Sequence, residues 1–296
     1  MTTTPQYTYV LTGCLVAFGL QAQVQEPAPI TGHYAAGVQG IRAASVPPPG
    51  IYFLDYNDFY TSDNMRYAGT KDFKVNVYAQ VPRLVWITDW KLFGFNYGMD
   101  ILAPFVYTDF RARPYHETKF GLGDASVEPI LLSRSFERFD IGAGYSFFAP
   151  TGEFDHTRPV SPGKGYWGHM LTLGGTYYFD KQKTFAFSAL DRYEINMEQQ
   201  QTHITPGQQN TLEAGLSAAI TKTIEVGVIG YYVQQTTDET GVGSSNVRDY
   251  VVAAGPEINI VWPSVGIITS LRYAYEIDAQ NRPQGQTACL TLTYRF

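Results

Sequence analysis

Apolar and polar residues alternate with a period of two along most of this chain. From 73 to 81 the odd positions carry apolar side chains, and the even positions carry Lys, Asn, Tyr and Gln. The same alternation recurs in 95–107, 139–149, 171–179, 212–220, 224–228, 250–260 and 265–275. Successive side chains of a strand point to opposite faces, so this period predicts strands that separate an apolar medium from a polar one.

Four further segments complete the strand pattern. Weaker alternation at 50–60, 120–133 and 184–196, together with the terminal segment 286–296, brings the prediction to about twelve strands across residues 50–296. Segment 84–94 fits the alternation worst, and we expect Pro82 to bulge or end a strand there.

The connections between these segments alternate in length. Those at 180–183, 221–222 and 262–263 are very short, whereas those at 61–71, 109–119, 151–166, 197–209, 236–247 and 277–285 are long and polar. Short turns at one end and long loops at the other are typical of outer-membrane barrels. The sequence therefore predicts an all-β fold, a transmembrane antiparallel up-and-down β-barrel with lipid around it.

Composition distinguishes this prediction from a soluble β-sandwich or propeller. Charged residues are 16% of the chain and aromatic residues 15%, with 28 Gly. Tyr and Phe gather at strand ends on the apolar face, where a membrane barrel has its aromatic girdles. The other face carries Gly, Thr, Ser and charges, which suits a polar lumen. The net charge of −6 gives no reason to expect nucleic acid as a partner.

The N-terminal region predicts two segments ahead of the barrel. The apolar run VLTGCLVAFGL at 10–20 has the length of a signal-peptide core, so we expect a signal peptide at 1–22, although no basic residue precedes Arg42. A structural N-terminal helix is the alternative, and Leu11–Cys14 resembles a lipidation motif at Cys14. Residues 23–49 then form either a periplasmic segment or a plug in the lumen.

The C-terminus carries a further signal. Residues 288, 290, 292, 294 and 296 are apolar, and the chain stops on Phe296. A closed barrel must pair its last strand with its first, because lipid cannot satisfy a free strand edge. Tyr294 and Phe296 are therefore candidates for an assembly signal read by the barrel assembly machinery of the outer membrane.

Strand parity predicts which charged side chains line the lumen. They are Lys74, Asp100, Asp124, Glu128, Asp140, Arg192, Glu194, Glu213, Glu225, Asp249, Glu257, Arg272, Glu276 and Arg295. One interpretation is an acidic conduit that disfavours anions, and the other is a hydrogen-bonded network that fills a narrow barrel. We also expect the four successive strands from 210 to 277 to contact the segment 31–49.

Residues that could support catalysis or metal binding are sparse. The five His have no pairing that suits a metal, and no Ser follows two residues after a His, as it does in lipases of this architecture. We therefore expect no enzyme activity, no metal and no cofactor.

Several short motifs resemble one family of outer-membrane transporters, named for the meta-pathway of phenol degradation. They are 46–53 (VPPPGIYF), 121–124 (GLGD), 149–154 (APTGEF), 162–167 (PGKGYW), 230–238 (GYYVQQTTD), 272–273 (RY) and 281–285 (NRPQG). The resemblance implies a barrel in the outer membrane of a Gram-negative bacterium, reached by secretion, and uptake of aromatic or hydrophobic compounds.

Three functions therefore fit the sequence. The first is a passive transporter for small hydrophobic or aromatic molecules. The second is a general diffusion pore for small hydrophilic solutes, and the third is a structural or adhesive barrel that acts through its long loops.

Overall fold

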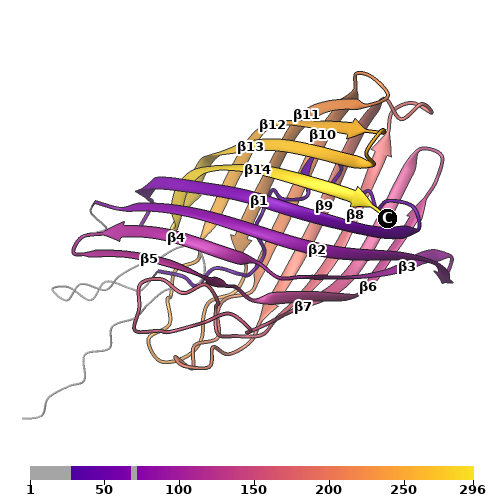
Figure 1. Ribbon diagram of the computed structural model, residues 1–296. Coiled ribbons are helices and arrows are strands. Elements are labelled where there is room, and N and C mark those ends of the chain that lie inside the picture. The colour runs from indigo at the N-terminus through magenta and orange to yellow at the C-terminus, as the bar shows by residue number, and fades with distance from the viewer. Residues whose placement is uncertain (1–27, 68–71) are drawn as a thin grey trace, which may run out of the picture.

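The computed structural model describes residues 28–67 and 72–296. The predicted signal peptide at 1–22 and Cys14 lie outside the described residues. Fourteen strands form one sheet (Figure 1): β1 (Gly50–Met65), β2 (Lys74–Leu92), β3 (Phe95–Leu102), β4 (Phe105–Ala112), β5 (Tyr115–Leu122), β6 (Ala125–Ser135), β7 (Phe139–Ala149), β8 (Gly168–Tyr178), β9 (Phe185–Asn196), β10 (Gln209–Ala219), β11 (Ile224–Gln235), β12 (Tyr250–Trp262), β13 (Ile267–Gln280) and β14 (Pro283–Arg295).

Strand pairing closes this sheet into a barrel. β1 pairs antiparallel with β14 on one edge and with β2 on the other, so the first and last strands complete the wall. β3 and β4 both pair with β2, and they pair onward with β6 and β5, respectively. β3 and β4 together occupy one position in the wall, and β5 and β6 together occupy the next, so fourteen strands make twelve positions. The predicted antiparallel barrel of about twelve strands is confirmed.

Pro82 and Pro104 mark the interruption in the wall. β2 runs through Pro82 in unbroken register with β1, so Pro82 does not end the strand. On its other edge, β2 changes partner from β4 to β3 between Gln80 and Arg83. A proline has no N–H to donate to a neighbouring strand, and the facing chain is interrupted at Ala103 and Pro104.

The two ends of the barrel differ in their connections. The turn end holds the tight turns at 93–94 and 263–266 and both the start of β1 and the end of β14. The loop end holds the long loops 150–167, 197–208 and 236–249. Two segments expected as long loops, 109–119 and 277–285, are instead extended strand with two-residue turns. In the first, β4 and β5 pair up to the turn; in the second, β13 continues beside β12, and β14 begins beside β1.

The wall of the barrel is apolar outside and polar inside. Leu171, Leu216 and Leu271 are more than half exposed on the outer face, as lipid-facing side chains are. Glu194, Glu213 and Ser217 are buried on the inner face. Among residues 28–67 and 72–296, no helix has the length and hydropathy to cross a membrane.

Lys74 does not follow the pattern of an apolar outer face and a polar inner face, and the prediction that it lines the lumen is wrong. Lys74 is exposed at the loop end of β2, whereas its neighbours Val75 and Val77 are buried. These valines pack inside the barrel with Phe110 of β4 and Val160 of a long loop. Because loops fill the barrel at this end, the inner face is apolar there and the polar side chains point outward.

Candidate functional site

Residues 28–49 run along the lumen from one end of the barrel to the other. At the loop end, the backbone N–H of Ile30 donates to Glu239 of the loop 236–249 at 2.5 Å. At the turn end, the carbonyl of Pro49 accepts a hydrogen bond from Arg295 at 3.0 Å. Between them lies a 3₁₀ turn, η1 (Gly40–Arg42). We refer to residues 28–49 as the inner segment.

Carboxylates of the wall hold the backbone of the inner segment. Glu194 accepts hydrogen bonds from the backbone N–H groups of His33, at 2.6 Å, and Tyr34, at 3.1 Å. Glu213 accepts from the Gly37 N–H at 2.6 Å and from the Tyr34 hydroxyl at 2.7 Å. These bonds satisfy backbone donors of a segment that forms no strand, and a buried polar group that stays unpaired costs free energy.

The middle of the inner segment is held by charges. Glu257 accepts from the Ile41 N–H at 2.9 Å and pairs with Arg272 at 3.4 Å. Arg272 also donates to the carbonyl of Val38. Arg42 pairs with Glu225 at 2.6 Å. The backbone of the segment thus lies between an acid and a base that neutralise each other, which keeps both charges paired inside the barrel.

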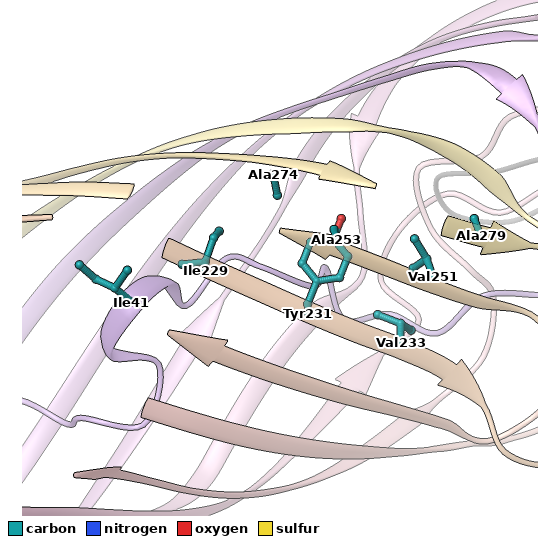
Figure 2. Close-up of a cluster of buried hydrophobic side chains, with 8 residues drawn as sticks. All are labelled: Ile41, Ile229, Tyr231, Val233, Val251, Ala253, Ala274 and Ala279. Atoms are coloured by element: carbon teal, nitrogen blue, oxygen red, sulfur yellow. The ribbon is translucent and has the colours of Figure 1, made fainter. Parts of the chain in front are cut away.

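Ile41 is the apolar anchor of the inner segment. Its side chain is fully buried against the inner face of β11, and Ile229, Tyr231 and Ala253 belong to the same cluster (Figure 2). Two wall glycines make room for this residue: a Cβ on Gly215 would lie 2.6 Å from the Ile41 Cα, and a Cβ on Gly227 would lie 2.8 Å from the Ile41 Cγ2. Gly215 therefore accommodates the backbone of Ile41, and Gly227 accommodates its side chain.

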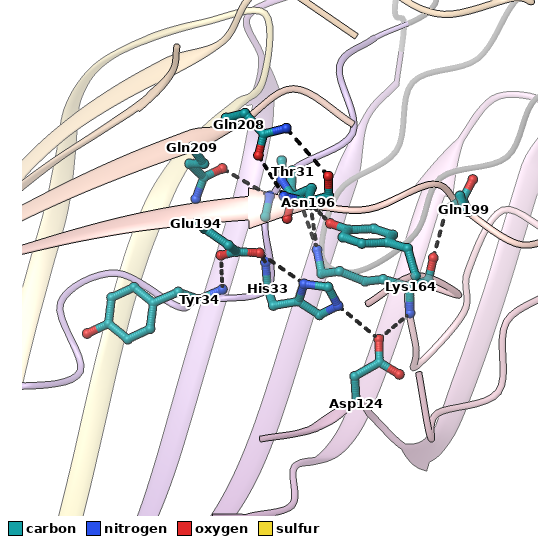
Figure 3. A network of polar contacts seen from close by, with 12 residues as sticks. Thr31, His33, Tyr34, Asp124, Lys164, Glu194, Asn196, Gln199, Gln208 and Gln209 are labelled. Atoms are coloured by element: carbon teal, nitrogen blue, oxygen red, sulfur yellow. Dashed lines mark hydrogen bonds and ion pairs between the residues drawn. The ribbon is translucent and has the colours of Figure 1, made fainter. Parts of the chain in front are cut away.

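A second network joins the start of the inner segment to the wall and to a long loop (Figure 3). The His33 ring lies between Glu194, at 2.9 Å from Nδ1, and Asp124, at 3.3 Å from Nε2. The Lys164 ammonium and the Tyr166 hydroxyl both donate to the carbonyl of Thr31, at 3.0 and 2.8 Å. Each of these side chains is buried, so their hydrogen bonds form at a low local dielectric, where they are stronger than in water.

Three of the family-like motifs meet at Asp124. Its carboxylate accepts from the Gly152 N–H at 2.9 Å and from the Lys164 N–H at 2.7 Å. Gly152 and Gly163 touch so closely that a Cβ on either would lie 2.6 Å from the other's backbone. Motifs 121–124, 149–154 and 162–167 therefore form one unit, in which loop 150–167 is fastened beside β5 and β6.

A cavity of about 280 Å³ remains in the lumen beside the inner segment. Its apolar lining includes Val77, Val81, Phe148 and Met170, and its charged lining includes Arg83 and Arg192.

Arg83 pairs with two carboxylates at the edge of this cavity. Its distances are 2.5 Å to Asp100 and 3.3 Å to Glu128, so one guanidinium is shared between two acids.

Most of the side chains predicted to line the lumen do lie inside the barrel. Asp100, Asp124, Glu128, Glu213, Glu257, Arg272 and Glu276 are buried there, and Glu225 is half-buried. Glu276 bonds to the hydroxyls of Tyr60 and Tyr231, both on wall strands.

The predicted residues of β14 and the residue after it lie at the turn end. Arg295 is exposed at the mouth of the lumen, and Tyr294 and Phe296 are exposed on the outer face with their rings 5.1 Å apart.

Within the described residues, no group of three or more His, Cys, Asp or Glu could hold a metal ion.

Two residues at the centre of the site were missed by the sequence reasoning. Arg83 follows Pro82, next to the segment where the alternation was poorest. Sequence parity put the odd positions of 73–81 on the lipid face, whereas Val77, Val81 and Arg83 all line the cavity. His33 had no strand to give it a direction. Its setting between Asp124 and Glu194 depends on where the inner segment lies, and no local pattern encodes that.

Comparisons with known proteins agree with this architecture. The family model described as "Putative MetA-pathway of phenol degradation" matches residues 57–292. An outer membrane channel from Pseudomonas putida F1 is similar in structure, with a TM-score of 0.75 at 12% identity, over 86% of this chain and 97% of that chain.

The translocator domain of the autotransporter NalP from Neisseria meningitidis gives a TM-score of 0.56 at 10% identity, over 86% of this chain and 91% of that one. The beta domain of the Bordetella autotransporter BrkA gives 0.53 at 13% identity, over 83% and 99%, respectively. No curated protein matches the sequence.

Proposed function

Because this chain belongs to the family named for the MetA pathway of phenol degradation, we propose that it is an outer-membrane channel for passive uptake of small hydrophobic or aromatic compounds. The chain is secreted to the periplasm of a Gram-negative bacterium and inserted by the barrel assembly machinery. The turn end then faces the periplasm and the loop end faces outside, as in other barrels of this kind.

The observation that carries the proposal is the cavity beside the inner segment. Its walls are mostly apolar in area, with Val77, Val81, Phe148 and Met170 among them, and five acidic and four basic residues also line it. Concave, mostly apolar sites with a few polar groups are typical of small-molecule binding. Apolar walls are poorly hydrated, so they suit a general pore for hydrophilic solutes less well.

The inner segment has the role of a plug in this proposal. It occupies the lumen from Ile30 to Pro49, and the wall carboxylates hold its backbone. A narrow path that a small apolar molecule can follow is then compatible with a low flux of ions. Displacing the segment opens a wider and more polar route, lined by the acids that it now covers.

Reconstitution tests the proposal directly. We would compare the full chain with a variant that lacks residues 28–46, after checking by heat-modifiable gel mobility that both are folded. The full chain should pass little current in planar bilayers, and it should admit toluene or phenol into liposomes faster than protein-free liposomes do while leaving glucose entry slow. The deletion should raise the conductance severalfold.

Two outcomes would contradict this function. Large steady currents and rapid glucose entry through the full chain would indicate a general diffusion pore. Equal conductance of the two folded proteins would show that the inner segment is not a plug.

A further inference from the structure

Arg192 differs from the other arginines that line the lumen. Arg83, Arg272 and Arg282 each hold a carboxylate within 3.4 Å. The Arg192 side chain forms no ion pair with any residue in the described part of the chain, although the residue is only 7% exposed. Its Nε and Nη1 atoms are buried without hydrogen-bond partners. The molecule therefore keeps guanidinium donors unused inside the barrel.

This arrangement is costly unless a ligand completes it. An arginine stays charged at every physiological pH, so Arg192 cannot relieve its burial by losing a proton. A buried charge or donor without a partner destabilises the fold. Asp100 and Glu128 pair with Arg83 at the edge of the same cavity, which charged residues of both signs also line, namely Asp58, Asp124, Glu276, Lys164 and Arg282. The acids lower the electrostatic cost of burying Arg192 but leave its Nε and Nη1 donors without partners.

The surroundings of Arg192 are those of a binding site. Its guanidinium carbon lies 4.2 Å from the centre of the Tyr34 ring, which fixes the plane of the group. Arg192 lines the cavity of about 280 Å³ together with Phe148 and Met170. At ~30 Å³ per water molecule, this volume equals roughly nine waters, enough for a molecule with one ring.

We propose that Arg192 binds the carboxylate of a small organic acid whose apolar body lies against Phe148 and Met170, a single-ring aromatic acid being the best fit. The guanidinium donates hydrogen bonds to the carboxylate, and the apolar walls take up the ring. This inference rests on the proposed uptake of aromatic compounds and names a substrate class for it. A lumen lined by acids does not by itself favour anions, so the selectivity for a carboxylate comes from the Arg192 guanidinium.

Binding measurements test the site with two probes that share a ring and differ in charge. Titration calorimetry on the full chain in detergent would compare benzoate with benzyl alcohol. We expect tighter binding of benzoate. Arg192→Gln should weaken benzoate binding about tenfold, the usual effect of losing a charged hydrogen bond, and leave benzyl alcohol unchanged. Arg192→Lys should restore part of the loss. Arg134→Gln, an exposed position at the turn end, should change neither.

The outcomes separate this site from the proposed function. Equal affinity for the two probes in the full chain, or an unchanged benzoate affinity in a folded Arg192→Gln variant, overturns the site. Entry of toluene or phenol into liposomes is measured on the same preparations. If uptake persists while the calorimetry fails, the channel proposal stands and only the carboxylate site falls. If uptake is absent while benzoate still binds through Arg192, the site stands and the channel proposal falls.

Discussion

Gly215 of β10 lies directly against the backbone of Ile41: a Cβ atom on Gly215 would come within 2.6 Å of the Ile41 Cα. The two residues are far apart in the sequence and meet because the inner segment passes over the wall at this point. A change at Gly215 would disturb the packing of Ile41, because Ile41 is fully buried and its N–H donates a hydrogen bond to Glu257.

Gly215→Val is therefore expected to displace the middle of the inner segment. Overpacking of this kind costs about 1–3 kcal/mol, which corresponds to roughly a five- to 150-fold shift toward the displaced state. Planar-bilayer recordings should show a higher mean conductance than the parent chain. Gly142→Ala is the matched control, because its nearest neighbour, the carbonyl oxygen of Ala44, is 3.6 Å away and leaves room for a methyl group. The same conductance for Gly215→Val and Gly142→Ala would argue against a tight contact.

Glu257→Gln is expected to loosen the same region by another route. The substitution leaves Arg272 buried without its counter-charge, a situation that costs about 3–5 kcal/mol when a buried pair loses one partner. Thermal unfolding followed by gel mobility should occur at a lower temperature.

A second substitution isolates the electrostatic part of this effect. Arg272→Gln made together with Glu257→Gln removes both charges and should recover much of the stability. If this double variant is as unstable as Glu257→Gln alone, the charge pair is not the cause.

In the protein that lacks residues 28–46, Glu225→Gln with Glu257→Gln should reduce the preference for cations, measured as a reversal potential.

Glu239 gives the loop 236–249 a pH dependence. Burial raises the pKa of this carboxyl to about 7, against the hydrogen bonds from Ile30 and Ser245, which lower it. Because the folded-state pKa is above the ordinary value of 4.5, the neutral form is favoured in the folded loop. Stability is then fully present below pH 4.5 and is lost as the pH rises through about 7, by at most roughly 3 kcal/mol.

Amide hydrogen exchange provides the measurement for Glu239. After correction for intrinsic exchange rates, the amides of Ile30 and Ser245 should be better protected at pH 5.5 than at pH 8.5. Glu239→Gln should abolish the difference, since the amide carries no charge at either pH. If the glutamine variant keeps the same pH dependence, another group is responsible.

Phe296 ties the end of the chain to the closure of the barrel. Its N–H donates to the carbonyl of Ile51 at 3.0 Å, and the residue is 72% exposed, on the outer face. Phe296→Asp, or deletion of the residue, should sharply reduce the compact, heat-modifiable band in cells, because a lipid-facing aromatic side chain and an edge contact are both lost. Val242→Asp, which alters an exposed apolar side chain in a long loop, should have no such effect. Normal levels of folded Phe296→Asp would show that the last residue is dispensable.

The sequence alone determined the barrel and most of its polarity. Period-two alternation is a local property, so it identified the strands from 139 to 275 and the inward acids such as Glu213 and Glu257. The requirement that no strand edge face lipid then implied that the last strand pairs with the first. The sequence placed the segment ahead of the first strand either in the periplasm or in the lumen, and it did not decide between the two.

Tertiary structure decided what depends on distant contacts. Lys74 points outward because loop residues such as Val160 fill the barrel at that height, and alternation carries no information on height. The extension of the hairpins at 113–114 and 281–282 depends on the partner strands that continue beside them. The pairing of Arg83 with Asp100 and Glu128, the seat of His33 and the unpaired state of Arg192 all follow from where the inner segment and its neighbours pack. These contacts join residues of different segments, from 17 positions apart for Arg83 and Asp100 to 161 for His33 and Glu194, and local periodicity cannot specify them.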